Sequence, residues 1–262
     1  MQLEIITRKP EGNARPTPIL FVHGMCHSAS CWENFLPYFA RQGYESHAVS
    51  LRGHGKSEGS GKVKWCSASR DYVADLEQVI SSLNISPVLI GHSMGGYVVQ
   101  KYLEKHDAPA AVLLASIPVN GTGRFAVRFL SRHPVQFVRY LLFFDPGQFL
   151  ATPQLLKELV FSPSVTDTDI ARYFERLQHE SYVMTIETFF ASLPKPRKVN
   201  APFYVLAAAN DAMFSVDEEQ ETARAYNTAA EIVPGMAHGM MLEPEWQKAA
   251  DLIIAWLTEK GL

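Results

Sequence analysis

The feature that most constrains this chain is the alternation of short, continuous apolar runs with amphipathic stretches along most of its 262 residues. Strands that are buried on both faces of a parallel sheet read as unbroken apolar runs, because neither face meets water. Parallel strands need crossover connections, which helices usually make. The pattern therefore predicts an α/β fold with a mostly parallel sheet and helices on both faces.

Six apolar runs are expected to form the parallel strands, after one earlier strand within "MQLEIITR". These runs are "PILFVHG", "SHAVSLRG", "PVLIGHS", "AAVLLAS", "PFYVLAAAND" and "AEIVPGMAH". Between them, apolar residues at three- and four-residue spacing predict helices. We expect a sheet of about seven to eight strands, in which the hairpin before the first parallel strand is incomplete.

The alternation stops between about Val119 and Val199, where several helical stretches follow one another without a convincing strand. We therefore predict a core in two parts, residues 1–118 and 197–262, with a helical cap (lid) inserted at 119–196. Its position suggests that it covers the carboxyl edge of the sheet, where open α/β sheets bind ligands.

Composition and charge exclude several classes of partner. The net charge of −3 provides no overall basic field with which to collect nucleic acid. No apolar run approaches the roughly 18 residues of a membrane span, and the first residues lack the basic and apolar regions of an export signal. The three cysteines have no metal-type spacing and are expected to be free thiols. These observations favour a soluble, cytoplasmic protein.

The segment "PVLIGHSMGGYVVQKYL" places Ser93 at the centre of a G-x-S-x-G sequence, between an expected strand and an expected helix. Such a sharp turn needs Gly91 and Gly95, because a Cβ at either position would collide with the neighbouring strand or helix. The turn would display the Ser93 hydroxyl above the sheet edge, beside the Met94 amide and the positive end of the helix dipole. A glycine-rich turn with a capping serine is the alternative, but the context favours a nucleophile.

A serine nucleophile needs a base, and the base needs a carboxylate that orients it. Two later strand ends provide candidates, Asp211 in "FYVLAAANDAMFS" and His238 in "AEIVPGMAHGMMLEP". The chain order Ser93, Asp211, His238 is that of α/β-hydrolases rather than that of chymotrypsin or subtilisin. Spacing alone leaves Asp145 and Asp217 as alternative acids.

The loop within "FVHGMCHSASCW" is expected to supply a second oxyanion donor, the Met25 amide, beside the Met94 amide. His23 and His27 lie four residues apart, but Gly24 between them disfavours a shared helical face and no third ligand is near. No metal site is therefore predicted, and the expected chemistry requires no cofactor.

Together these segments resemble the α/β-hydrolase superfamily. Five motifs, which span nearly all of the expected core, carry the resemblance: "FVHG" at 21–24, "LRGHGKS" at 51–57, "GHSMGG" at 91–96, "ND" at 210–211 and "GMAHGMMLEP" at 235–244. The resemblance implies that Ser93 is the nucleophile, Asp211 the acid and His238 the base. It also implies that the Met25 and Met94 amides form the oxyanion hole.

A narrower resemblance joins "VHGMCHSASCW" and "HGMMLEP" to the plant methylesterase and hydroxynitrile lyase branch. In the lyases a lysine follows the catalytic histidine, whereas this chain has Gly239 at that position. The resemblance therefore favours ester cleavage. Ser50 stands where the family motif "DLRGHGxS" begins with aspartate, a departure that affects a structural turn.

The predicted function is hydrolysis of small or medium-chain apolar carboxylic esters through an acyl-enzyme intermediate. A monoacylglycerol lipase or lysophospholipase, a thioesterase, a C–C hydrolase and a hydroxynitrile lyase remain alternatives among enzymes. A small-molecule receptor of this fold with slow turnover is the alternative from another class. The aromatic content of the insertion suits an apolar pocket if some of its rings face Ser93.

The first helix expected in the insertion carries Arg124, Arg128 and Arg132 at four-residue spacing. A basic amphipathic helix can lie on an anionic membrane, but a solvated face is the favoured interpretation because Pro134 interrupts the stripe. The sequence thus predicts no stable membrane insertion, leaves open a weak contact of the cap with a membrane surface, and does not indicate an oligomeric state.

Overall fold

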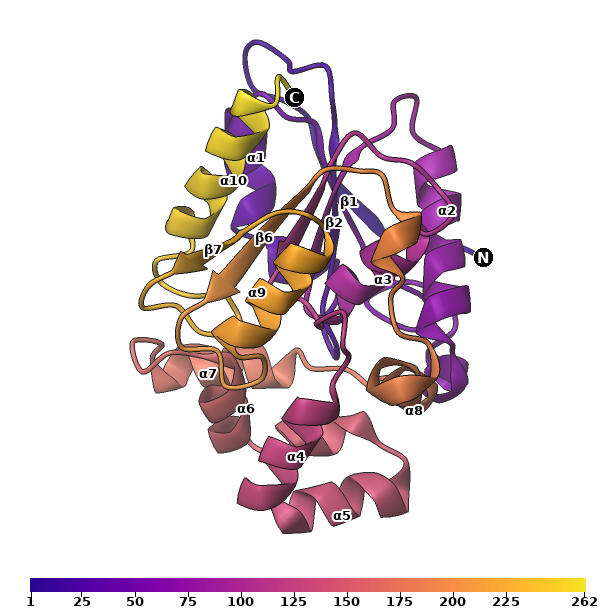
Figure 1. The fold of residues 1–262 in the computed structure, drawn as a ribbon, viewed down its shortest axis with the longest axis vertical. Helices are drawn as coiled ribbons and strands as arrows, with labels where there is room; N and C mark the ends of the chain where they lie inside the picture. Colours follow the sequence, from indigo (N-terminus) through magenta and orange to yellow (C-terminus); the bar gives the residue numbers. More distant parts are fainter.

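The computed structural model describes residues 1–262, and its centre is one seven-stranded sheet with the order β1-β3-β2-β4-β5-β6-β7 (Figure 1). The strands are β1 (Ile5–Arg8), β2 (Ile19–Val22), β3 (Ser46–Val49), β4 (Val88–His92), β5 (Ala111–Leu114), β6 (Phe203–Ala208) and β7 (Ala230–Val233). β1 pairs antiparallel with β3, and all other neighbours are parallel. The predicted mostly parallel α/β sheet is confirmed.

Burial explains why the strands were readable in the sequence. Every residue of β2, β4 and β5, which occupy the middle of the sheet, is buried. β1 and β7 form the two edges and are partly exposed. One strand alone precedes β2, so the sheet has seven strands, the lower of the two expected numbers.

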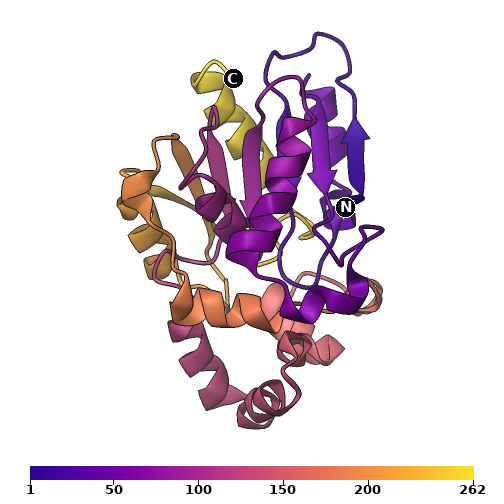
Figure 2. The ribbon, with the colours of Figure 1, turned by 90° about the vertical axis from the view of Figure 1, so that its right-hand side faces the viewer.

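Helices cover both faces of the sheet (Figures 1 and 2). α1 (Phe35–Arg41) and α10 (Gln247–Glu259) pack together on one face. α2 (Val73–Ser81), α3 (Met94–Tyr102) and α9 (Val216–Ala225) cover the other. The short helical segments η1 (Ala29–Trp32), η2 (Ser60–Trp65) and η3 (Ala68–Tyr72) lie in the connections before α1 and α2.

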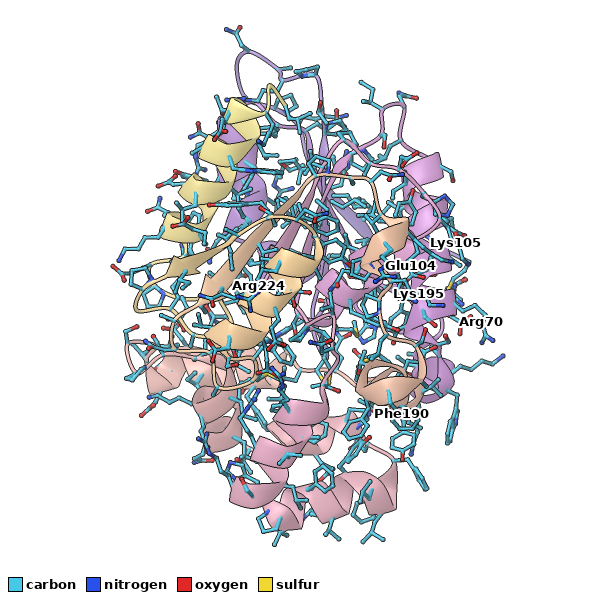
Figure 3. The ribbon with its side chains drawn as sticks, in the orientation of Figure 1. Arg70, Glu104, Lys105, Phe190, Lys195 and Arg224 are labelled. Carbon is cyan, nitrogen blue, oxygen red and sulfur yellow. The ribbon has the colours of Figure 1, made fainter.

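Between β5 and β6 the chain forms helices only, as the sequence predicted, and we call residues 119–196 the inserted helices. They are α4 (Gly123–Arg132), α5 (Pro134–Phe143), η4 (Pro146–Leu150), α6 (Pro153–Val160), α7 (Asp167–Glu175), α8 (Tyr182–Ile186), η5 (Glu187–Ala191) and the start of η6 (Pro196–Lys198). They lie at the carboxyl ends of the strands, at the lower end of Figure 1; Figure 3 shows the same view with Phe190 of η5 labelled. The division into core and cap domains stays a prediction.

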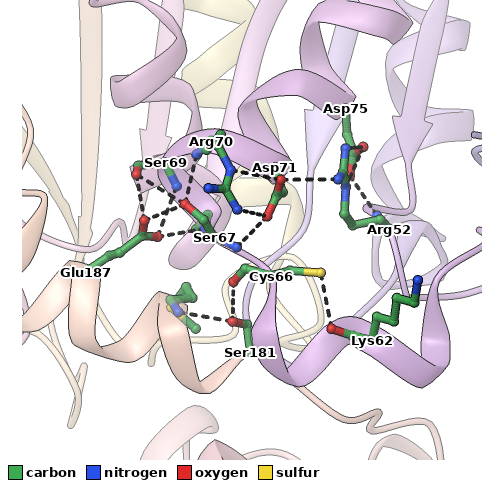
Figure 4. A network of polar contacts seen from close by, with 12 residues as sticks. Arg52, Lys62, Cys66, Ser67, Ser69, Arg70, Asp71, Asp75, Ser181 and Glu187 are labelled. Carbon is green, nitrogen blue, oxygen red and sulfur yellow. Dashed lines mark hydrogen bonds and ion pairs between the residues drawn. The ribbon is translucent and has the colours of Figure 1, made fainter.

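Polar contacts tie the inserted helices to the core. The Glu187 carboxylate in η5 accepts hydrogen bonds from the Ala68 amide at 2.7 Å, the Ser69 amide at 3.1 Å and the Ser69 hydroxyl at 2.7 Å (Figure 4). These donors lie at the start of η3, where backbone N–H groups have no helical acceptor. The contact therefore satisfies the end of one element and fixes the position of another.

The arginine stripe of α4 differs from the favoured interpretation of a solvated face. Arg124 lies 3.0 Å from the Glu221 carboxylate, and Arg128 donates to Glu218 at 2.7 Å. Both partners belong to α9, so two of the three arginines join the inserted helices to the core, while Arg132 makes no ion pair. None of the helices combines the length and the apolarity that a membrane crossing requires.

Candidate active site

Ser93 lies in the sharp turn between β4 and α3. Its φ of 51° and ψ of −117° are rare for a residue other than glycine. The backbone of neighbouring segments approaches so closely that a Cβ on Gly95 would lie 2.2 Å from the Val22 carbonyl oxygen. A Cβ on Gly91 would lie 2.5 Å from the Gly95 carbonyl oxygen. The steric reason for both glycines is therefore the one that the sequence predicted.

His238 and Asp211 meet where the loops after β7 and β6 converge. His238 Nδ1 lies 2.8 Å from Asp211 Oδ2, and both side chains are buried. The other carboxylate oxygen, Oδ1, accepts hydrogen bonds from the Met213 amide at 2.7 Å and the Phe214 amide at 2.9 Å. The carboxylate is thus fixed by backbone donors and holds the imidazole in one orientation.

The two alternative acids do not contact His238. Asp145 Oδ1 accepts a hydrogen bond from the Gly147 amide at 3.0 Å and so caps η4. Asp217 lies in the first turn of α9, where a carboxylate complements the helix dipole. Of the three candidate acids, Asp211 alone hydrogen-bonds to the histidine.

Ser93 and His238 line the same narrow cavity, together with Met25 and His27. No hydrogen bond joins the Ser93 hydroxyl to His238 in this conformation, and catalytic hydrogen bonds commonly tighten only when substrate is bound. His92 Nε2 lies 2.9 Å from the His238 carbonyl oxygen and donates to it. Burial lowers the pKa of His92 well below its usual value, so this imidazole is a neutral support for the histidine loop.

The two amides predicted for the oxyanion hole are free. Met94 is the first residue of α3, where a backbone N–H has no acceptor within the helix. Neither the Met94 amide nor the Met25 amide donates a hydrogen bond within the chain. Met25 also lines both cavities that reach Ser93.

A larger cavity of about 230 Å³ extends from Ser93 between the inserted helices. Fifteen of its 19 lining residues are hydrophobic, so the space suits apolar groups. Aromatic side chains from five of the inserted elements contribute to it: Phe125, Phe137, Tyr140, Phe149, Tyr182, Phe189 and Phe190. This cavity, which we call the apolar cavity, therefore joins the serine to the inserted helices.

Glu180, between α7 and α8, is a buried residue that sequence reasoning missed. Its Oε2 accepts a hydrogen bond from the Cys26 amide at 3.2 Å and forms an ion pair with His54 Nε2 at 3.2 Å. Its Oε1 accepts from the Tyr72 hydroxyl at 2.6 Å. Cys26, which has a positive φ of 62°, follows Met25 directly, so a residue of the inserted helices holds the loop of one expected oxyanion donor.

Charge explains how the Glu180 carboxylate is tolerated in the interior. Burial by itself would raise the pKa of Glu180, but His54 and the hydrogen bonds around the carboxylate lower it to about 2. Burial lowers the pKa of His54, yet the neighbouring carboxylate more than offsets this, so the net pKa of His54 is raised. The pair is therefore charged in mildly acidic solution, above the pKa of Glu180 and below that of His54.

The two histidines that follow β2, His23 and His27, are both buried. Burial lowers the pKa of His23 to about 3 and the pKa of His27 to about 4, so both are neutral near pH 7. His23 Nε2 accepts a hydrogen bond from the Leu51 amide at 3.1 Å. No group of three or more His, Cys, Asp or Glu side chains is arranged to hold a metal ion.

A sequence profile described as the alpha/beta hydrolase family matches residues 19–250. The chain belongs to this family. The matched range runs from β2 into α10, so this α/β-hydrolase matches in both parts of the core and in the inserted helices. The resemblance inferred from the five motifs is confirmed.

Named relatives match this α/β-hydrolase over part of their length. A non-heme haloperoxidase of Rhodococcus erythropolis is 34% identical over 114 residues, which cover 42% of this chain and 40% of that protein. Methylesterase 10 of Arabidopsis thaliana is 31% identical over 115 residues, which cover 36% of this chain and 41% of that protein. The chain therefore spans about two fifths of the length of these relatives.

The fold is similar to that of solved esterases along nearly the whole chain. A thermophilic esterase from Thermogutta terrifontis superposes with a TM-score of 0.73, covering 99% of this chain and 94% of that one. The two sequences are 18% identical, so the likeness concerns the fold.

Proposed function

We propose that this α/β-hydrolase cleaves small or medium-chain apolar carboxylic esters, with Ser93, His238 and Asp211 as its catalytic residues. One observation carries the proposal: Ser93 lines both the narrow cavity that contains His238 and the apolar cavity. An ester whose acyl group occupies the apolar cavity would bring its carbonyl carbon to the Ser93 hydroxyl, with the imidazole beside it.

The first half of the reaction forms an acyl-enzyme. His238 Nε2 takes the Ser93 proton while Oγ attacks the ester carbonyl, and Asp211 stabilises the imidazolium. The Met25 and Met94 amides donate to the oxyanion, and the loss of one such donor typically costs about 2.7–4 kcal/mol. His238 then protonates the departing alcohol. Water activated by the same imidazole releases the acid, and no cofactor takes part.

The apolar cavity sets the substrate class within this proposal. Its volume of about 230 Å³ lies below the roughly 300–1,000 Å³ of sites that enclose drug-sized ligands. Its lining is mainly hydrophobic, so a charged acyl group would lose hydration without gaining partners. A short or medium apolar acyl chain fits both properties.

Gly239 argues against cyanohydrin cleavage. A Cβ at this position would already lie 3.0 Å from Phe161 Cε1 and from Val160 Cγ1, so the lysine of the lyases would not fit without rearrangement. A receptor would differ from the proposed esterase in its slow turnover. A lipase or lysophospholipase would differ from it in the length of acyl chain that it accepts. The cytoplasmic location stays a prediction.

Covalent labelling with a fluorophosphonate probe tests the nucleophile. We expect the wild-type protein to be labelled and Ser93→Ala to lose labelling while remaining folded, since the change removes one hydroxyl. His238→Ala should lose nearly as much activity, because members of one catalytic unit fail together. Ser131→Ala is the matched control, because that exposed serine bonds only within α4. Equal labelling of Ser93→Ala would refute the assignment.

A series of soluble esters with increasing acyl length tests the substrate class. We expect steady-state turnover that peaks at short or medium chains and falls when the acyl group exceeds the apolar cavity. A maximum at long chains would favour the lipase or lysophospholipase alternatives. Negligible turnover on every ester, with ligand-dependent change in the inserted helices, would favour the receptor.

A further inference from the structure

The exposed large hydrophobic side chains are concentrated on the inserted helices. Fifteen such residues are exposed in the whole chain, and ten of them form what we call the apolar face: Val127, Leu130, Val135, Val138, Leu141, Leu142, Phe143, Phe144, Phe189 and Phe190. Figure 3 shows side chains projecting from α5 at the lower end of the molecule, near the labelled Phe190. Monomeric soluble proteins rarely expose a large contiguous apolar surface unless it binds something.

The apolar face adjoins the entrance of the apolar cavity. Leu141, Phe189 and Phe190 are exposed and also line that cavity, which reaches Ser93. An apolar molecule held against this face would therefore have a continuous apolar path to the serine. The face and the candidate active site form one connected surface.

The segment that carries most of the apolar face is basic, while Asp145 follows it directly and Glu158 pairs with its His133 at 3.0 Å. Residues 119–144 include four arginines and no aspartate or glutamate, in a chain whose net charge is −3. Arg124 and Arg128 are paired with α9, but Arg132 and Arg139 make no ion pair. Lys64 adds a third cation, because its ammonium donates to the Phe143 carbonyl at 2.7 Å.

The cations lie among the aromatic rings rather than apart from them. The Arg139 guanidinium is 5.9 Å from the centre of the Phe143 ring, and the Lys64 ammonium is 5.9 Å from that of Phe144. Apolar side chains interleaved with Lys and Arg are the composition of elements that lie in the plane of a membrane interface.

We propose that the apolar face docks on the surface of a lipid bilayer that contains anionic lipids, and that ester substrates enter the apolar cavity from that bilayer. The docking rests on surface chemistry alone, whereas the entry of substrate rests on the proposed ester hydrolysis. Anionic headgroups complement the unpaired cations, and the apolar side chains enter the acyl boundary. A second copy of the chain fits less well, because a two-fold interface would place the same cations against one another.

Vesicle flotation tests the docking directly. We expect the wild-type protein to bind vesicles of phosphatidylcholine with added phosphatidylglycerol, to bind pure phosphatidylcholine more weakly, and to lose binding to the anionic vesicles as salt is raised. The double variant Val135→Asp/Leu142→Asp should bind about tenfold less or weaker still, since two exposed side chains lose their apolar contact with lipid. Neither residue lines the apolar cavity, so hydrolysis of a soluble short-chain ester should be unchanged.

Ile85→Asp is the matched control, because Ile85 is an exposed aliphatic residue that lies outside the inserted helices. It should bind vesicles as the wild type does. Absence of wild-type binding to both vesicle types, or equal binding by the double variant, would overturn the proposal. A dimer that the double variant dissociates, without vesicle binding, would overturn it in favour of a second copy. Vesicle binding without turnover of any ester would leave the docking intact and refute the proposed function instead.

Discussion

Ser93 occupies a backbone conformation that its surroundings must hold in place. A non-glycine residue in such a region costs about 1–3 kcal/mol. Four backbone hydrogen bonds offset part of this cost. The Ser93 amide donates to the Leu114 carbonyl at 3.2 Å, and the Ser93 carbonyl accepts from the amides of Gly96 at 3.0 Å, Tyr97 at 3.3 Å and Ile117 at 3.1 Å. Two of these partners belong to β5 and the segment after it, so the sheet itself positions the hydroxyl.

Gly95→Ala should disrupt this turn. The added Cβ would meet the Val22 carbonyl oxygen at 2.2 Å, and a strand backbone cannot move aside as a flexible side chain can. We expect a loss of about 1–3 kcal/mol or more in the free energy of unfolding, and a loss of esterase activity. Urea unfolding and ester turnover measure the two effects. Gly61→Ala is the control, because its Cβ would meet no atom within 4 Å, and equal stability of both variants would contradict the steric account.

Asp211→Asn should lower kcat by up to about 10⁴-fold while the fold persists. The amide oxygen can still accept from the Met213 and Phe214 amides, but the amide nitrogen would then face His238 Nδ1 and favour the wrong tautomer. Single-turnover kinetics measure the loss of kcat, and circular dichroism shows whether the fold persists. Asp217→Asn serves as the control, and a larger loss of kcat in that variant would reassign the acid.

At the scale of elements, the loop after β2 depends on a segment that follows it by more than 150 residues. The Cys26 amide donates to Glu180, and the Cys26 carbonyl accepts from the Gln178 amide at 2.9 Å. Both partners belong to the connection between α7 and α8. The inserted helices thus contribute to the geometry of the Met25 amide as well as to the walls of the apolar cavity.

Glu180→Gln should lower both stability and kcat. The change leaves the buried His54 without its counter-ion, and breaking a buried pair from one side commonly costs about 3–5 kcal/mol. We expect kcat to fall more than KM rises, because the displaced group is the Met25 amide rather than the wall of the cavity. His54→Gln added to Glu180→Gln should recover part of the loss of stability, as a double-mutant cycle would measure. Strict additivity of the two changes would mean that the pair is not coupled.

At the scale of the whole molecule, burial keeps three histidines neutral close to the candidate active site. The pKa values of His23 and His27 are lowered to about 3 and about 4, and the pKa of His92 is lowered well below its usual value. In the unfolded chain the same residues titrate near 6.5. Below that pH these three residues bind more protons in the unfolded state than in the folded state, so they lower the free energy of unfolding as the solution becomes more acidic.

The free energy of unfolding should therefore decrease between about pH 7 and about pH 4, with His27 alone contributing about 3 kcal/mol at the lower value. The raised pKa values of the buried His54 and Glu219 act in the opposite direction and make the decrease smaller. Glu180, with its lowered pKa, begins to lose its contribution only below about 4.5, its usual value. Urea unfolding at several pH values measures the slope, and His27→Gln should make it shallower. A rise in stability toward acid would contradict the burial of neutral imidazoles.

Local patterns carried most of the fold and much of the site. Buried strands need unbroken apolar runs and surface helices need a periodic apolar stripe, so both could be predicted from the sequence. The same holds for the helices between β5 and β6. The G-x-S-x-G turn could also be predicted, because its glycines are required by close backbone contacts that every such turn makes. Chain order alone pointed to Asp211 and His238, although spacing did not separate Asp211 from Asp145 and Asp217.

The tertiary structure decided the contacts between distant parts of the chain. The hydrogen bond from the Cys26 amide to Glu180 joins residues 154 positions apart. The ion pair between Arg128 and Glu218 joins α4, which precedes β6 in the chain, to α9, which follows it. Neither pairing is visible in the periodicity or composition of the sequence. A glutamate that will be buried looks the same in a sequence as one that will be exposed, because only its partner distinguishes them. A local sequence determines which element forms, since that depends on neighbours within a few residues. Which elements meet is decided only when the whole core packs.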